Sequence, residues 1–205
     1  WRGGRAFSLV YNTDDPELRA RLLNFTFVGG GFAGVEALAE LEDMARNATR
    51  YYSNISPDDM SWKLVEAAHR VMPEVSEKMG VYVVNALEEG GIKVYLGTLL
   101  KSVEGGHAVL SDGTEFETDT LVWNAGVKAN PVLKSSDLPL DERRRLRTTA
   151  HLRAEGLPDV WAAGDCANVP DLSKSEEDPN AICAPSAQHA VRQANQLAKN
   201  VLASL

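Results

Sequence analysis

The stretch that decides the fold is FTFVGGGFAGVEALAEL, residues 25–41. Its apolar beginning, residues 25–28, predicts a buried β-strand. Three glycines follow, and a stripe of apolar residues at helical spacing then continues to about Ala48. A strand, a glycine turn and a helix in this order predict the first βα unit of an α/β fold.

The glycine turn fits the pattern G-x-G-x-x-G, with Gly29, Gly30, Gly31 and Gly34 in place. In this pattern the first glycine permits a tight turn, the second lets a pyrophosphate approach the backbone, and the third lets the helix pack on the strand. The free N–H groups at the start of the helix favour phosphate. No Gly-Lys-Ser/Thr follows, which excludes a nucleoside-triphosphate loop. The pattern predicts a dinucleotide site, and the alternative is a turn that only joins strand to helix.

Glu66 is the candidate for nucleotide selection, because it ends the second predicted strand, residues 62–66. A carboxylate there accepts hydrogen bonds from the adenosine ribose and repels a 2′-phosphate. Glu66 lies 35 positions after Gly31 (66 minus 31), and a long helix and loop account for the excess over the usual ~20. We therefore expect NADH. The alternatives are a solvated glutamate at a strand end and an NADP preference set by the nearby Arg70.

Further elements extend the alternation. A helix at 75–89 and a strand at 92–96 imply parallel pairing with right-handed crossovers. Residues 101–123 predict an antiparallel β-meander that turns at Asp112 and Gly113. The other expected elements are a short helix at 17–23 capped by Asp15, a strand at 159–165 and a last helix at 187–202.

Composition narrows the classes of partner. The formal charge is −8, which attracts no phosphate backbone, so a nucleic-acid partner is not expected. No apolar run approaches the ~18 residues of a membrane span, and residues 1–12 do not resemble a signal peptide. Cys166 and Cys183 form neither a C-x-x-C pair nor a metal-ligand cluster. We expect reduced thiols, no metal site and a cytoplasmic location.

Four stretches together resemble a known family: residues 28–36 (VGGGFAGVE), 121–128 (LVWNAGVK), 160–167 (VWAAGDCA) and 184–193 (APSAQHAVRQ). They closely resemble the type II NADH:quinone oxidoreductases, which are flavoproteins of the pyridine-nucleotide–disulfide-oxidoreductase-like superfamily. The resemblance implies an α/β fold of the two-dinucleotide-binding-domain type. This fold has a Rossmann-like parallel sheet with an antiparallel β-meander, here joined to part of the FAD domain.

The resemblance also implies a division of the chain. We expect an N-terminal segment with a short helix at 1–24, an NADH-binding domain at 25–128 and a partial FAD-binding domain at 129–205. The family begins with a separate G-x-G-x-x-G domain for the ADP half of FAD and ends with a region that docks on the cytoplasmic face of the membrane. Neither is recognisable in this sequence, so we expect a truncated piece that lacks the membrane contact.

Site residues are carried over by the same resemblance. Glu36 is expected beside the nicotinamide, and Ala125 with Gly126 over the dinucleotide. Asp165, preceded by Gly164, is expected on the flavin ribityl chain, and Gln188 beside the isoalloxazine and the quinone pocket. Glu36 and Gln188 are thus the catalytic candidates. The plainer alternatives are a helix-dipole carboxylate for Glu36, a helix cap for Asp165 and a surface residue for Gln188.

The implied function is transfer of a hydride from NADH to FAD and of electrons onward to quinone. NADH and quinone are the expected partners, and a homodimer is left open. Two alternatives stand: an NAD(H)-binding remnant without redox turnover, and another flavin-dependent reductase such as a ferredoxin reductase. The sequence departs from the family at Arg192, where a second glutamine is common. Residues 143–145, all arginine, run through a turn where a glycine is easier.

Overall fold

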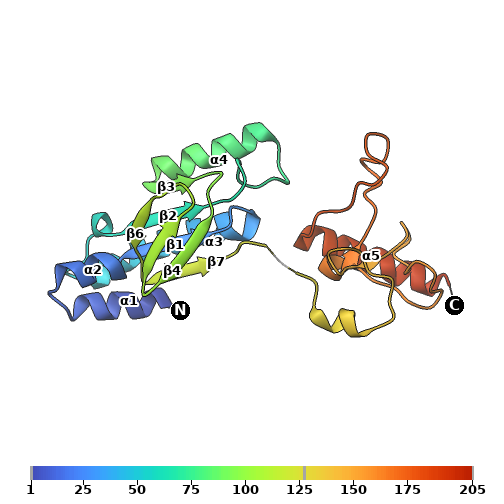
Figure 1. The fold of residues 1–205 in the computed structure, drawn as a ribbon, viewed down its shortest axis with the longest axis horizontal. Helices are drawn as coiled ribbons and strands as arrows, with labels where there is room; N and C mark the ends of the chain where they lie inside the picture. The colour runs from blue at the N-terminus through green and yellow to red at the C-terminus, as the bar shows by residue number, and fades with distance from the viewer. Residues whose placement is uncertain (1, 127, 205) are drawn as a thin grey trace. The chain divides into compact units, whose positions relative to one another are not determined.

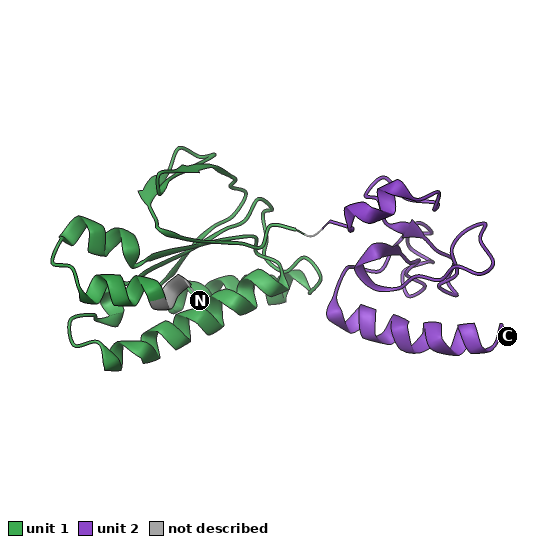
Figure 2. Ribbon diagram, turned by 90° about the horizontal axis from the view of Figure 1, so that it is seen from below, with its two compact units in different colours: residues 1–126 green, residues 127–205 purple. Residues whose placement is uncertain are grey.

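A computed structural model describes residues 2–126 and 128–204 of the chain. The chain divides into two compact units, Trp1–Gly126 and Val127–Leu205 (Figures 1 and 2). The predicted boundary after residue 128 lies close to this division. The residues expected as a separate segment at 1–24 belong to the first unit, because their apolar side chains enter its core.

A four-stranded parallel sheet forms the centre of the first unit, in the order β3-β2-β1-β7. Its strands are β1 (Asn24–Val28), β2 (Ser61–Val65), β3 (Ile92–Tyr95) and β7 (Thr120–Trp123). Phe25 of β1 lies opposite Trp62 on one side and Thr120 on the other. All five residues of β1 are buried, as expected of a strand covered on both faces. The Rossmann-like parallel sheet is therefore confirmed.

Helices cover one face of this sheet (Figure 2). They are α1 (Arg2–Tyr11), α2 (Pro16–Leu22), α3 (Phe32–Ala48) and α4 (Glu77–Glu89), with short 3-10 turns at Thr49–Tyr51 and Pro57–Asp59. Phe27 and Leu64 of the sheet pack with Leu38 of α3 in one core. Asp15 caps α2 as predicted, since its Oδ1 accepts the N–H groups of Glu17 and Leu18 at 3.0 and 3.3 Å.

Helix α1 was not expected from the sequence. Phe7 and Val10 are almost fully buried, with 1% and 0% of their surface exposed, and the Phe7 ring lies 5.4 Å from that of Tyr52. Ala6, Phe7 and Val10 have the spacing of one helix face, so the signal was present but short.

The antiparallel meander covers the other face of the sheet. It consists of β4 (Leu100–Glu104), β5 (His107–Leu110) and β6 (Glu115–Glu117), and Leu110 packs with Val28 and Val65. The hairpin at Asp112 and Gly113 is confirmed, with Gly113 at φ +90°. The prediction that the meander continues to residue 123 is wrong. The Thr118 hydroxyl donates to the carbonyl of Asn24 at 2.8 Å, and beyond this point β7 joins the parallel sheet beside β1.

The second unit is built around a small apolar core that includes Leu146, Leu152 and Val169. Its elements are η3 (Pro131–Ser135), β8 (Leu146–Arg147), η4 (Gly164–Cys166), β9 (Ala167–Asn168) and the predicted last helix, α5 (Ala187–Leu202). The strand expected at 159–165 does not form. Trp161 makes only an isolated bridge to Arg153. Among the described residues, this segment has no longer stretch of backbone to pair with as a strand.

In the part of the chain that the structure describes, no helix is both long and apolar enough to span a membrane.

Candidate functional site

Two glycines of the turn between β1 and α3 are required by the packing of the chain itself. Gly29 has φ +107°, and a Cβ there would lie 2.6 Å from the carbonyl carbon of Asn124. A Cβ on Gly34 would lie 1.9 Å from the carbonyl oxygen of Gly29. The close approach at Gly34 holds the helix against the end of the strand, and the one at Gly29 permits the tight turn beside Asn124, as the G-x-G-x-x-G pattern predicts for its last and first glycines.

Gly31 is different, because nothing in the chain requires a glycine there. Its backbone has φ −71° and ψ 178°, which any residue adopts. A Cβ on Gly31 would meet no atom within 4 Å. Gly31 is also the N-cap of α3, so the space beside it adjoins the helix end where unpaired N–H groups favour an anion. Bare backbone at this point therefore fits the close approach of a phosphate group.

Glu66 is built into the same turn. Its Oε2 accepts the N–H of Gly30 at 2.5 Å and its Oε1 accepts the N–H of Ala68 at 2.7 Å. The N–H of Met72 in turn donates to the carbonyl of Gly30 at 2.8 Å. Gly30 is thus held from both sides, and the Glu66 carboxylate is not a freely solvated strand end.

Arg70, the residue that would favour NADP, hydrogen-bonds to the backbone of the loop in which it lies. Its Nη2 donates to the carbonyl of Val75 at 2.5 Å and, less closely, to that of Met72 at 3.4 Å. The Arg70 guanidinium therefore stabilises the loop that follows β2, and Glu66 remains the charged group bonded to the glycine turn.

The loop after β7, residues 124–126, lies beside the glycine turn between β1 and α3. The N–H of Asn124 donates to the carbonyl of Val28 at 2.7 Å, which aligns the end of β7 with the end of β1. Ala125 and Gly126 follow and are exposed, with Gly126 at φ +87°. The amide Nδ2 of Asn124 is buried without a hydrogen-bond partner in the described chain. An orphaned donor beside Gly29 is consistent with a site that a polar ligand completes.

The predicted site residues fall into two groups, one in each unit. Glu36 belongs to the first group; it is exposed on α3, five residues beyond the N-cap. Gly164, Asp165 and Gln188 belong to the second unit, where Gln188 is exposed on the first turn of α5.

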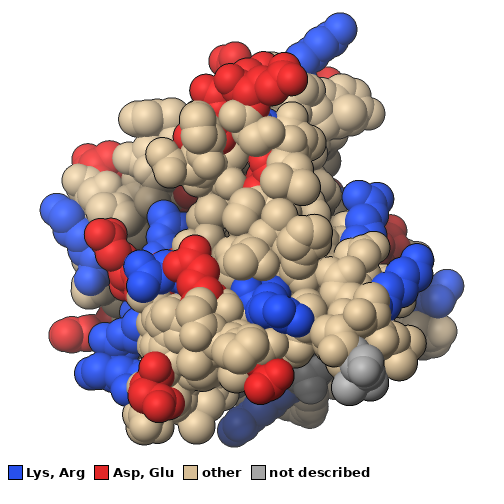
Figure 3. Space-filling view, turned by 90° about the vertical axis from the view of Figure 1, so that its right-hand side faces the viewer, with Lys and Arg blue, Asp and Glu red and all other residues tan. Residues whose placement is uncertain are grey.

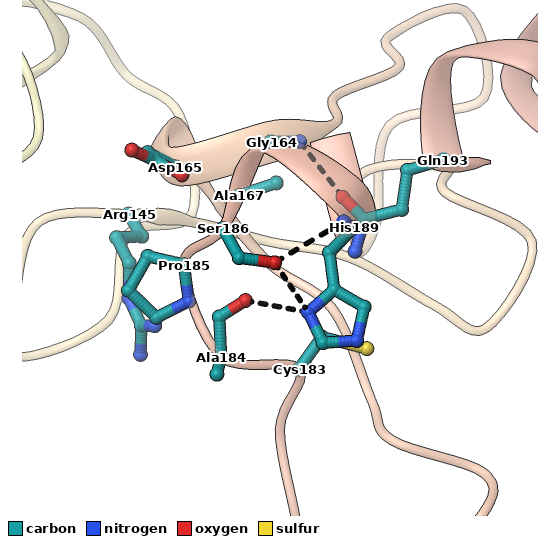
Figure 4. A pocket seen from close by; sticks show the side chains of 10 residues that line it. All are labelled: Arg145, Gly164, Asp165, Ala167, Cys183, Ala184, Pro185, Ser186, His189 and Gln193. Atoms are coloured by element: carbon teal, nitrogen blue, oxygen red, sulfur yellow. Dashed lines mark hydrogen bonds between the residues drawn. The ribbon is translucent and has the colours of Figure 1, made fainter. Parts of the chain in front are cut away.

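The turn at Gly164 and Asp165 is fixed by α5 (Figure 4). Gly164 has φ +72°, and its N–H donates to Oε1 of Gln193 at 2.8 Å. At the start of α5, Ser186 accepts the N–H of His189 at 3.2 Å. Asp165 is left exposed at the turn. Sequence reasoning missed Gln193, although its place in the motif at 184–193 was a usable signal.

A hollow of about 580 Å³ opens beside Asp165 in the second unit. Its size suits a small-molecule site. An exposed carboxylate after a glycine of positive φ, at the edge of such a hollow, fits contact with a polyhydroxyl chain such as the flavin ribityl group.

Comparison with known proteins shows the family of the chain. Residues 4–194 match the family model described as pyridine nucleotide-disulphide oxidoreductase. The chain is 32% identical over 183 residues to the type II NADH:quinone oxidoreductase of Haemophilus influenzae, covering 88% of this chain and 40% of that protein. It is 36% identical over 164 residues to an external alternative NADH-ubiquinone oxidoreductase of Yarrowia lipolytica, covering 74% of this chain and 28% of that protein.

Among solved structures, NDH2 from Plasmodium falciparum in complex with NADH superposes with a TM-score of 0.70 at 16% identity. That alignment covers 95% of this chain and 50% of the other, and it shows the shared fold. The chain thus spans two fifths or less of the length of the curated relatives named above. The expected resemblance to type II NADH:quinone oxidoreductases is confirmed. On its residues, its fold and these matches, the chain belongs to the pyridine nucleotide-disulphide oxidoreductase family.

Proposed function

We propose that this chain carries the NADH-binding part of a flavin-dependent NADH dehydrogenase that passes electrons to quinone. The observation that carries the proposal is Gly31. Its backbone is unstrained and its missing Cβ faces open space at a helix N-terminus, so a ligand's close approach is the best reason for glycine there. The pyrophosphate of NADH is the group that we assign to this position.

Glu66 sets the choice of nucleotide in this proposal. Its carboxylate is hydrogen-bonded to the turn that would hold the pyrophosphate, so the adenosine ribose follows within its reach. Hydroxyls at the 2′ and 3′ positions can donate to it, whereas a 2′-phosphate adds a second negative charge. Ala125 and Gly126, exposed at the other edge, lie over the dinucleotide.

Bound NADH would supply a hydride, and bound FAD would accept it and pass electrons to the quinone. The residues of this chain supply positioning. Glu36 is assigned to the nicotinamide end, Asp165 to the ribityl chain, and Gln188 to the ring and quinone end. The whole protein would then work peripherally on a membrane, as the resemblance implies for the cytoplasmic face, since a quinone acceptor is dissolved in the bilayer.

A nucleotide-binding protein without turnover is the second candidate, since the glycine turn and Glu66 fit a nucleotide without any contribution from a flavin. The colour of the purified protein separates the two. A chain that retains stoichiometric flavin and oxidises NADH with a soluble quinone is the dehydrogenase. A colourless chain that binds NADH, gains no flavin and shows no turnover is the binding protein.

Nucleotide choice provides the direct test. Wild-type protein should bind NADH at least about tenfold more tightly than NADPH, a difference of about 1.4 kcal/mol. Glu66→Gln should bring the two affinities close together, because it removes the charge that faces the 2′-phosphate. Isothermal titration calorimetry of both nucleotides measures this.

Glu88→Gln on α4 is the matched control, since Glu88 is exposed and distant in sequence from the turn. It should leave the preference unchanged. Equal affinity of the wild-type chain for NADH and NADPH would contradict the assignment of Glu66.

A further inference from the structure

We propose that the second unit contains an anion-binding site of its own, in which Arg143, Arg144 and Lys128 hold a phosphate or pyrophosphate group. The site is the hollow of about 580 Å³ beside Asp165. It does not depend on the glycine turn of the first unit. If its ligand is FAD, it deepens the proposed function by giving the flavin pyrophosphate a partner in this chain.

Four of the nine residues that line this hollow are cations. It is lined by Lys128, Ala129, Pro131, Glu142, Arg143, Arg144, Arg145, Asp165 and Pro185. On the face drawn in Figure 3, lysine and arginine side chains are interspersed with acidic ones.

Arg145 has a structural role. Its guanidinium Nη2 lies 2.7 Å from Oδ2 of Asp141, and both side chains are nearly buried, at 10% and 12% exposure. Asn168 donates to the same carboxylate oxygen at 3.0 Å. This pair neutralises Arg145 and fixes the turn at residues 141–145.

Arg143 and Arg144 are left for a ligand. Both are exposed, and among residues 2–126 and 128–204 neither takes part in an ion pair. Lys128 lines the same hollow, and so do two carboxylates, Glu142 and Asp165. The cations thus outnumber the carboxylates once Arg145 is paired with Asp141.

Arg144 stands in a backbone conformation that costs a non-glycine residue energy. Its φ is +64°, in the left-handed region where glycine is favoured. The turn is held by Asp141, whose carbonyl accepts the N–H of Arg144 at 2.9 Å and whose Oδ1 accepts the N–H of Arg145 at 2.8 Å. Strained residues of this kind cluster at functional sites. An arginine kept where glycine is easier points to a use for its side chain.

Phosphate is the ligand chemistry that fits. A guanidinium presents parallel N–H donors that match two phosphate oxygens, and two adjacent arginines with a lysine can hold a dianion. Two sources share this chemistry, the pyrophosphate of FAD and a free nucleoside diphosphate.

The test uses the full chain, labelled with ¹⁵N and titrated with inorganic pyrophosphate in the presence of saturating NADH. Amide shifts should appear at residues 143–145 and 164–165. Arg144→Gly and Arg143→Gln should each weaken pyrophosphate binding fivefold or more. Lys199→Gln, an exposed cation on α5 outside the hollow, is the control and should leave it unchanged.

Arg144→Gly also separates binding from folding, because glycine relieves the left-handed backbone. Its melting temperature should rise by a few degrees, roughly the effect of relieving one strained residue in a small domain, while pyrophosphate affinity falls. Unchanged affinity in both arginine variants, or shifts confined to residues 29–36, would overturn the proposal.

Three further ligands identify the source. Stronger binding of FAD than of ADP assigns the site to the flavin, and equal binding assigns it to a nucleoside diphosphate; Arg144→Gly should weaken both. Riboflavin, which lacks phosphate, should be insensitive to Arg144→Gly. Equal binding of FAD and riboflavin, unaffected by the variant, would contradict the site. Failure of NADH binding in the first unit would not change these outcomes, since they rest on residues of the second unit.

Discussion

Gly29, Gly31 and Gly34 belong to one motif but are glycines for different reasons. Added Cβ atoms on Gly29 and Gly34 would collide with the backbone, whereas one on Gly31 would meet nothing within 4 Å. Motif matching alone treats the three alike. Only the geometry separates the glycines that shape the turn from the one that leaves room for a ligand.

Lys63 is a second residue whose environment decides its behaviour. Its side chain is buried between β2 and the meander, where Nζ donates to Oδ1 of Asn24 and to Oγ of Ser61, both at 2.7 Å. The Phe116 ring lies 4.7 Å away. Both acceptors are neutral, so burial is the main cause that lowers the pKa of Lys63 to about 8, with Lys93 adding to it.

This pKa predicts how stability depends on pH. Between pH 8 and the ordinary lysine value of 10.5, the unfolded chain binds the proton of Lys63 and the folded chain does not. The free energy of unfolding should therefore rise with pH across that range, by as much as about 3 kcal/mol from this residue. Below pH 8 both states hold the proton and the contribution is constant.

Lys63→Met isolates the effect, since it cannot titrate. Urea unfolding at pH 7, 8, 9 and 10 should show the wild type gaining stability relative to the variant above pH 8. A constant difference between the two proteins over this range would show that Lys63 has an ordinary pKa in the folded chain.

At the scale of elements, the contact between β1 and α3 is the most constrained in the first unit. Gly34→Ala would place a methyl group 1.9 Å from the carbonyl oxygen of Gly29, so the helix must move away from the strand. We expect the free energy of unfolding to fall by roughly 2 kcal/mol or more, despite the better helix propensity of alanine.

Gly31→Ala is the matched control, three residues earlier in the same turn. It adds the same methyl group in open space and should cost less than about 1 kcal/mol, as a weaker N-cap. Thermal or urea unfolding compares the two. Equal losses would mean that the close packing at Gly34 does not hold the helix.

The sequence predicted those elements whose signal is local. Strands β1, β2 and β3 are short runs rich in aromatic and β-branched residues, and α3, α4 and α5 have helical periodicity over thirteen or more residues. Residues 120–123 and 159–165 were assigned wrongly because partners distant in the sequence decide their state. Thr118 directs the first of these into the parallel sheet, and the second finds only a short bridge.

The candidate site was predictable to a similar extent. The glycine turn and Glu66 carry local patterns, and the structure joins them through Gly30. Met72 and Gln193 were missed, since each acts through a bond to a glycine far away in the chain. No spacing rule links residues 42 and 29 positions apart (72 minus 30 and 193 minus 164).

At the scale of the whole molecule, the proposal assigns each unit its own part of the chemistry. The first has a glycine turn hydrogen-bonded to Glu66, to which we assign NADH, and the second has an exposed Asp165 beside a hollow lined by four cations and two carboxylates. The two sets of residues match the order of the family's motifs along the chain. NADH binding should therefore be a property of the first unit alone, unaffected by changes in the second.

The most direct test of the central claim is the affinity of Gly31→Val for NADH, measured by calorimetry on the full chain. A Cβ at this position meets no atom within 4 Å, and the valine side chain would occupy the place of the pyrophosphate. Asp15→Ala is the control; it removes the cap of α2 at a cost of about 1 kcal/mol and should leave NADH affinity unchanged. We predict that Gly31→Val folds with a comparable melting temperature and binds NADH at least tenfold more weakly. Unchanged NADH affinity in Gly31→Val would show that the glycine turn is not the nucleotide site.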